Sequence, residues 1–168
     1  MTGISYLHPE LGGFADEDWM ALALREAITA FDEDEVPVGA VAVHEGRVIA
    51  RAYNQCERLR DPTAHAEMLV ITQAAESLGY PRLNDVTVFV TKEPCVMCAG
   101  ALVHARVQRV VIGAPDVKVG ACGTVLDVIS HPALNHRIEL AWGVREEECR
   151  QLLQEFFRRR RKTKSPDG

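Results

Sequence analysis

Two short segments of the chain carry residues of the types that hold a catalytic metal ion. The first is His65-Ala66-Glu67, and the second, about thirty residues later, is Pro94-Cys95-Val96-Met97-Cys98. One imidazole and two thiols supply three protein ligands for Zn²⁺. Three protein ligands plus a water molecule are typical of catalytic zinc, whereas structural zinc usually has four protein ligands. The pattern therefore predicts a catalytic zinc site on His65, Cys95 and Cys98, with the Glu67 carboxylate beside the water.

The spacing of the two cysteines predicts that both lie in the first turn of a helix. Residues at i and i+3 project from one side of a helix, and a helix N-terminus favours the thiolate form. The flanking sequence agrees, with a buried strand at 86–91 before Pro94 and an apolar helix over 96–105 after it. The Asp-Pro-Thr segment at 61–63 likewise predicts a helix that starts near His65 with this proline in its first turn.

Simpler interpretations of these residues remain open at this point. A Cys-x-x-Cys pair also occurs as a redox pair in cytosolic α/β proteins, and a structural zinc site would need a fourth ligand. His104 is the nearest candidate, but at about 100° per residue it faces away from Cys95. Glu67 by itself would be an ordinary first-turn acid that stabilises the helix dipole. The two segments together favour catalytic zinc over these alternatives.

The composition is that of a soluble globular protein of one ordinary domain. The chain has 168 residues, of which 47% are hydrophobic and 26% are charged. No apolar run is long enough to span a bilayer, and the N-terminus lacks the form of a signal peptide. Cys56, Cys122 and Cys149 show no disulfide-framework spacing and indicate reduced thiols. We expect a cytoplasmic protein with no membrane segment and no organic cofactor.

The charge is distributed unevenly along the chain. Residues 156–164 carry six cations and no acid, so the remainder must carry −11 to give the total of −5. A basic patch on an acidic body indicates a local contact with a polyanion. The competing interpretation is a solvated helix end, where Lys and Arg favour the helix dipole. For the adjacent Phe156 and Phe157, we expect one ring to pack in the core and the other to contact a ligand.

The hydrophobic pattern predicts an α/β fold with a mixed five-stranded sheet and helices on both of its faces. Alternation of helices and strands in the second half predicts parallel pairing there. In the first helix, Ile28 lies beside the expected apolar stripe. We also expect a weakly ordered arm at 1–15, a single domain at 16–164 and a disordered tail at 165–168. The expected helices are 16–31, 64–78, 96–105 and 145–161, and the expected strands are 38–43, 48–53, 86–91, 107–113 and 138–142.

The chain resembles the cytidine deaminase-like superfamily and, more closely, the bacterial tRNA-specific adenosine deaminases. The resemblance covers nearly everything after residue 16. It rests on the two metal segments above, on Glu35-Val-Pro-Val-Gly-Ala40, on Asn135-His136-Arg137, and on the Phe pair before the Arg run. It implies the three-layer α/β/α fold of that superfamily. The chain departs from the commonest family pattern at Gln55-Cys56, Lys92 and Pro115, positions that bear on substrate preference.

Carried over position by position, the resemblance implies both the chemistry and the substrate. Zinc would be held by His65, Cys95 and Cys98, with Glu67 as the proton shuttle. The reaction would be hydrolytic deamination of adenosine to inosine at wobble position 34 of a tRNA anticodon loop, with tRNA-Arg the expected substrate and a homodimer the expected assembly. The residues implied to line the adenine pocket are Val38, Asn54, Ala66 and Pro94, and those implied to touch neighbouring nucleotides are Asp116, Lys118 and Phe157.

Two other functions remain alternatives at this stage. A small-molecule deaminase for guanine, cytosine or cytidine would use the same zinc chemistry but would not need the basic C-terminal segment. A non-catalytic zinc or RNA-binding module would not need a carboxylate at position 67. The six cations and Glu67 are therefore the features that distinguish the tRNA deaminase from these two alternative functions.

Overall fold

The structure is a computed structural model that describes residues 13–164. The expected arm at 1–15 lies outside the described residues except for 13–15, and the expected tail at 165–168 lies outside them entirely. In chain order the elements are α1 (Asp16–Asp32), β1 (Gly39–His44), β2 (Arg47–Tyr53), α2 (Cys56–Leu59), α3 (Ala66–Leu78), β3 (Val86–Lys92), α4 (Val96–His104), β4 (Arg109–Ala114), β5 (Glu139–Ala141) and α5 (Glu146–Thr163).

The five strands form one mixed sheet, as predicted, and their order in the sheet is β2-β1-β3-β4-β5. β1 pairs antiparallel with both β2 and β3, whereas β3, β4 and β5 are parallel neighbours. The β1–β2 turn is tight because Glu45 and Gly46 both have positive φ, 49° and 70°. Positive φ at both central residues is the geometry that matches the twist of a two-residue hairpin. The parallel half of the sheet is connected through α4, which carries the two cysteines.

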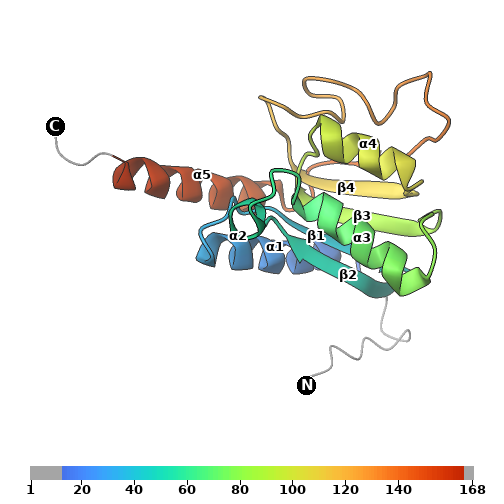
Figure 1. Cartoon of the computed structure of the whole chain (residues 1–168), viewed down its shortest axis with the longest axis horizontal. Coiled ribbons are helices and arrows are strands. Elements are labelled where there is room, and N and C mark those ends of the chain that lie inside the picture. The colour runs from blue at the N-terminus through green and yellow to red at the C-terminus, as the bar shows by residue number, and fades with distance from the viewer. Residues whose placement is uncertain (1–12, 165–168) are drawn as a thin grey trace.

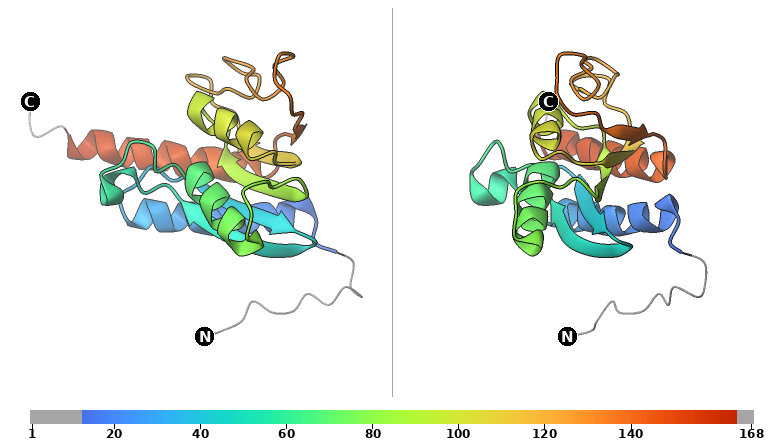
Figure 2. Two further views of the ribbon diagram at one scale, coloured as in Figure 1. Left: turned by 45° about the vertical axis from the view of Figure 1, so that its right-hand side comes forward. Right: turned by 90° about the vertical axis from the view of Figure 1, so that its right-hand side faces the viewer.

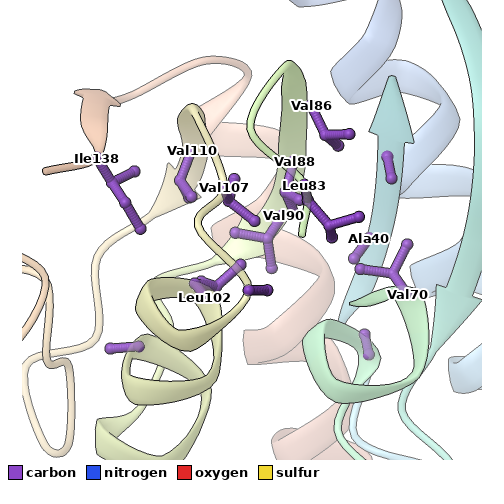
Figure 3. Close-up of a cluster of buried hydrophobic side chains, with 14 of the residues drawn as sticks. Ala40, Val70, Leu83, Val86, Val88, Val90, Leu102, Val107, Val110 and Ile138 are labelled. Carbon is purple, nitrogen blue, oxygen red and sulfur yellow. The ribbon is translucent and has the colours of Figure 1, made fainter. Parts of the chain in front are cut away.

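Helices cover both faces of the sheet and give the expected three layers. α3 and α4 lie on one face, while α1 and α5 lie on the other (Figures 1 and 2). Alternate residues of β3 serve the two layers: Val86, Val88 and Val90 belong to the core under α3 and α4, and Phe89 belongs to the core under α1. Figure 3 shows the first of these cores, where Leu102 of α4 points toward the valines of β3.

Helix α1 lies very close to the sheet, and one of its residues, Ile28, differs from the expectation. A Cβ atom on Gly39 would lie 2.1 Å from the carbonyl oxygen of Ala23 and 2.5 Å from the backbone nitrogen of Ala27, so only glycine fits there. The helix approaches β1 through small side chains, and its apolar stripe is narrower than predicted. Ile28, which we expected beside the apolar stripe of the helix, is 47% exposed.

The chain just before the first metal segment also differs from the prediction. The carboxylate of Asp61 accepts hydrogen bonds from the backbone N–H (2.8 Å) and hydroxyl (2.7 Å) of Thr63. These bonds form a turn of their own, and α3 begins only at Ala66. Pro62 therefore lies in the turn that precedes the helix, not in its first turn as predicted. The short helix α2 was not predicted.

Within residues 13–164, none of the helices combines the length and the apolar character needed to cross a bilayer.

Candidate metal centre and active site

The three predicted metal ligands come together at the N-termini of two helices. His65 is the residue that caps α3, and Cys95 caps α4, with Cys98 in the first turn of α4. Their ligand atoms all lie within 4.8 Å of one another. His104, the rejected fourth ligand, sits at the far end of α4 and is not part of this group. His65, Cys95 and Cys98 therefore form a group that could hold one metal ion.

The distances within this group fit a tetrahedral metal ion. His65 Nδ1 lies 3.7 Å from Cys95 Sγ and 3.4 Å from Cys98 Sγ. Tetrahedral zinc with its usual bond lengths to nitrogen and sulfur places such atoms about 3.5 Å apart. The donor set of one imidazole and two thiols also suits zinc, and it leaves one coordination position for a water molecule. The residues present therefore fit the metal that the sequence predicts.

The two thiols differ in their acidity. A hydrogen bond from Cys98 stabilises the Cys95 thiolate and lowers its pKa to about 3. The same bond, together with burial, raises the pKa of the Cys98 thiol. The pair thus shares a proton, which a bound cation would displace because metal ligands must be thiolates.

Glu67 lies in the first turn of α3, two residues after His65, and its side chain is only 4% exposed. It lines the same pocket as His65 and Cys95 but is not one of the three grouped ligands. Burial raises the pKa of its carboxyl group. A carboxyl group beside the metal ligands can act as a general acid and base. We call His65, Glu67, Cys95 and Cys98 the site floor.

A pocket of about 280 Å³ opens above the site floor. Most of the residues that the family resemblance implies for the substrate line it, namely Val38, Asn54, Ala66, Asp116 and Phe157. Two others do not: Pro94 is buried next to the ligand Cys95, and Lys118 is exposed on the loop after β4. The carbonyl of Pro94 accepts a hydrogen bond from the backbone N–H of Ala121 (2.9 Å), and this bond helps to fix the backbone at the start of α4.

One wall of the pocket, residues 54–61 with α2, is held by Glu35. The Glu35 side chain is 1% exposed, and its two oxygens accept hydrogen bonds from the backbone N–H groups of Glu57 (3.1 Å) and Arg58 (2.6 Å). These donors belong to the first turn of α2, which presents Cys56 and Glu57 to the pocket. Glu35 therefore sets the position of this wall.

A second wall, the loop at residues 115–125, is held by Glu93. This side chain is 2% exposed, and its carboxylate accepts hydrogen bonds from the backbone N–H groups of Asp116 (2.8 Å), Cys122 (3.1 Å) and Thr124 (3.2 Å). Gly120 is required beside it, because a Cβ there would lie 2.4 Å from the Glu93 carboxyl carbon. We refer to the two segments, 54–61 and 115–125, as the pocket walls.

The anchoring roles of Glu35 and Glu93 were missed by the sequence analysis, although Glu35 lies in a segment that carries the family resemblance and Glu93 directly precedes the second metal segment. Glu35 ends an acidic run and Glu93 follows Lys92, so the residues around them give no sign that these two carboxylates are buried. The Asn135-His136-Arg137 segment, which also carries the family resemblance, organises the loop that precedes Glu139. His136 Nε2 lies 2.7 Å from the Val107 carbonyl, and Arg137 donates hydrogen bonds to the carbonyls of Ser130 and His131.

Helix α5 contributes the outer rim of the pocket. Phe156 is 2% exposed and packs edge-on against Phe31, whereas Phe157 is 42% exposed and lines the pocket. One ring thus packs in the core, as expected, and the other lines the cavity, where its contact with a ligand stays a prediction. Of the cations at 158–164, Arg160 is the one that lines the pocket, with its guanidinium over the Phe156 ring. Figure 1 shows that the C-terminal half of α5 extends beyond the sheet.

Comparison with known proteins agrees with this geometry. A model of the MafB19-like deaminase family matches residues 14–161. The tRNA-specific adenosine deaminase of Bacillus subtilis (strain 168) is 49% identical over 149 residues, which make up 89% of this chain and 92% of that protein.

Solved structures are similar as well. One, from "Biochemical and Structural Studies of A-to-I Editing by tRNA:A34 Deaminases at the Wobble Position of Transfer RNA", superposes with a TM-score of 0.78 at 46% identity, covering 80% of this chain and 98% of that one. A structure of NE0047 in complex with 2,6-diaminopurine has a TM-score of 0.75 at 26% identity, covering 84% of this chain and 81% of that one. This chain therefore belongs to the MafB19-like deaminases and, among them, to the tRNA-specific adenosine deaminases.

Proposed function

We propose that the protein deaminates adenosine to inosine at wobble position 34 of a tRNA anticodon loop, with water as the second reactant and ammonia as the second product. One observation carries this proposal: a His-Cys-Cys group and a buried carboxylate form the floor of a pocket whose rim carries an exposed aromatic ring and an arginine. The floor suits hydrolysis of an amino group, and the rim suits a nucleic acid.

Zinc is the metal we propose for His65, Cys95 and Cys98. When bound, it makes a water molecule acidic enough to act as a nucleophile at neutral pH. Glu67 is placed to accept the proton of that water and to deliver it to adenine N1, which prepares C6 for attack. The same carboxyl group then gives a proton to the departing amino group, so that ammonia leaves. Burial of Glu67 keeps both transfers away from bulk solvent.

The substrate must present its base outside a helix stack. A pocket of this size admits one base, and enzymes that act on bases use single-stranded or extruded nucleotides. We propose that Val38, Asn54 and Ala66 contact the extruded adenine, and that Phe157 stacks on a neighbouring base of the loop. Asp116 and Lys118 remain proposed contacts to neighbouring nucleotides, and Pro94 acts through the backbone next to Cys95.

The alternatives have less support. A small-molecule deaminase shares the fold, and NE0047 binds 2,6-diaminopurine, but that relative is much less similar than the tRNA-specific enzymes. Such an enzyme gives no role to the exposed Phe157 or to the six cations that follow it. A non-catalytic module gives no reason to bury Glu67 in a pocket beside the metal ligands.

One assay tests the proposal directly. The zinc-loaded protein is incubated with the anticodon stem-loop of tRNA-Arg, with the same stem-loop carrying guanosine at position 34, and with free adenosine, guanine and cytidine. We expect inosine only from the first substrate, with release of one ammonia per inosine. Deamination of a free base or nucleoside at a higher kcat/KM than the stem-loop would replace this function with the small-molecule one.

We further propose that the protein works as a homodimer in the cytoplasm. All five cysteines are free thiols, which suits a reducing compartment. Val117 and Val125 of the 115–125 pocket wall, and Leu126 directly after it, expose apolar side chains that a second copy would cover. Sedimentation equilibrium gives the mass in solution, and a mass of one chain at micromolar concentration would contradict the dimer.

A further inference from the structure

The pocket is acidic, although its proposed substrate is a polyanion. Five acidic side chains line it, against one lysine and one arginine, Lys92 and Arg160. The carboxylates of Glu35 and Glu93 are occupied by backbone N–H groups, but their charge remains. An RNA backbone that enters this pocket is therefore repelled unless a cation lies close to its path. Arg160 lies on the rim in α5, so Lys92 is the cation that belongs to the body of the domain.

The position of Lys92 is fixed by its surroundings. It is the last residue of β3, three residues before the ligand Cys95, and it pairs with Ala114 of β4. Its ammonium nitrogen lies 2.6 Å from Asp116 Oδ2. The other oxygen of that carboxylate accepts hydrogen bonds from the backbone N–H groups of Lys118 (2.9 Å) and Val119 (3.2 Å). Asp116 is thus held by its own loop and directs the ammonium group.

The ammonium group retains capacity to bind a ligand. It has three N–H donors, and the contact with Asp116 uses one of them. The side chain is 28% exposed and lines the pocket. In RNA the bases and riboses are neutral, and the phosphates alone are anionic. A compact ammonium group recognises phosphate as a point charge.

We propose that Lys92, directed by Asp116, binds a backbone phosphate next to the extruded adenosine. This inference rests on the proposed function, because a free nucleoside has no such phosphate. Lys92 is then a specificity-determining residue: it favours adenosine within a polynucleotide over adenosine alone, and the rate of the chemical step does not depend on it.

The first experiment compares Lys92→Gln, Lys92→Arg and the control Arg82→Gln. Arg82 is an exposed cation just before β3, at the opposite end of the strand from Lys92. Kd for the anticodon stem-loop is measured as a function of salt concentration in a Glu67→Ala background, which prevents turnover. The values of kcat and KM are measured in the otherwise native chain.

For Lys92→Gln we expect Kd and KM to rise about tenfold, with kcat changed less than about threefold. The slope of log K against log salt should fall by about 0.7, the value for one phosphate contact on a single strand. Lys92→Arg should keep the slope, and Arg82→Gln should change nothing.

Asp116→Asn separates phosphate binding from a merely structural role of the ion pair. This variant loses the contact that directs Lys92 but keeps the positive charge, so it should weaken binding without reducing the salt slope. If the pair only supports the loop, Lys92→Gln and Asp116→Asn will behave alike and neither will change the slope. That result would overturn the inference.

A second experiment locates the phosphate. Stem-loops are made in which the phosphate on the 5′ or the 3′ side of the target adenosine is replaced by an uncharged methylphosphonate. One of the two should weaken binding to the native pocket about tenfold and have no further effect on Lys92→Gln. Equal losses in both proteins for both RNAs would show that Lys92 touches neither phosphate. If native protein neither binds nor deaminates any stem-loop, the proposed function fails as well, and this outcome is distinct from the failure of Lys92 alone.

Discussion

The site floor and the pocket walls are built in different ways. The floor consists of residues that are two or three positions apart within two helix starts, so local helix geometry orients them. The walls are held by Glu35 and Glu93, whose hydrogen bonds reach donors 22 to 31 residues further along the chain. The site floor is suited to carry the chemistry of the reaction. The pocket walls are suited to decide which substrate enters. This comparison predicts different consequences for substitutions in the two regions.

The largest effect is expected from the metal ligands. Cys95→Ala and His65→Ala should empty the site and abolish deamination, because three ligands are needed to hold the ion. Removal of the metal by a chelator should have the same effect on the native protein, and added zinc should restore activity. Elemental analysis measures metal per chain, and Cys56→Ala, which alters another thiol of the pocket, is the control that keeps it. Full activity of the metal-free protein would show that the floor is not a metal site.

The next largest effect is expected at Glu67. Glu67→Ala should keep metal and RNA affinity but lower kcat by about 10²–10⁴, the usual contribution of a positioned acid–base group. Single-turnover rates measure the chemical step, and Glu57→Gln serves as the control because this exposed carboxylate lines the same pocket. Nearly normal turnover of Glu67→Ala would assign the proton transfers to another group.

The walls should respond more weakly and through a different parameter. Glu93→Gln replaces one acceptor oxygen with an NH₂ group that cannot accept the backbone N–H groups of the loop. We expect a loss of about 1–3 kcal/mol in the free energy of unfolding, an increase of about tenfold in KM, and normal metal content. Chemical denaturation and steady-state kinetics measure these changes, with Glu76→Gln on the exposed side of α3 as the control. A loss confined to kcat would mean that the walls take part in the chemistry and would remove the distinction.

The basic end of α5 should affect binding alone. Truncation after Phe157 removes six cations, of which we expect two to four to contact RNA at once, so the salt slope should fall by about 1.5–3. The single-turnover rate at saturating RNA should stay close to normal. Truncation after Lys164 keeps all six cations and is the matched control. An unchanged slope would mean that the cations only solvate the helix end.

No effect on deamination is expected from an ion pair outside both regions. Arg109 donates two hydrogen bonds to Asp16 (2.8 and 2.7 Å), and the pKa of Asp16 is lowered mainly by these bonds. Because the pKa is lower in the folded state, the pair stabilises the fold above about pH 4 and ceases to do so as the pH falls through the folded-state pKa. Asp16→Asn should cost about 1 kcal/mol at pH 7, and the difference from the native chain should shrink as the pH is lowered toward 3. Thermal unfolding at both pH values measures this, and a difference independent of pH would contradict the account.

Much of the floor and of the sheet could be predicted from the sequence. The i, i+3 cysteines, the His-x-Glu segment and the alternation of apolar residues are local signals, and the structure places them as expected. The predictions that differ concern single residues. Ile28 of α1 is exposed although the periodic pattern places it beside the apolar stripe. The side-chain hydrogen bonds of the Asp61–Thr63 turn compete with helix formation, so α3 starts after Pro62.

By itself the sequence predicted the candidate metal ligands, the candidate acid–base residue, the succession of helices and strands along the chain and the family. These follow from residue types at short spacings, which local backbone geometry converts into positions. The tertiary structure alone decided which acids hold the walls, which cation reaches the pocket from α5, and that Lys92 pairs with Asp116. The physical reason is that a buried carboxylate takes whichever N–H groups the fold brings within about 3 Å, and no spacing along the chain specifies those partners.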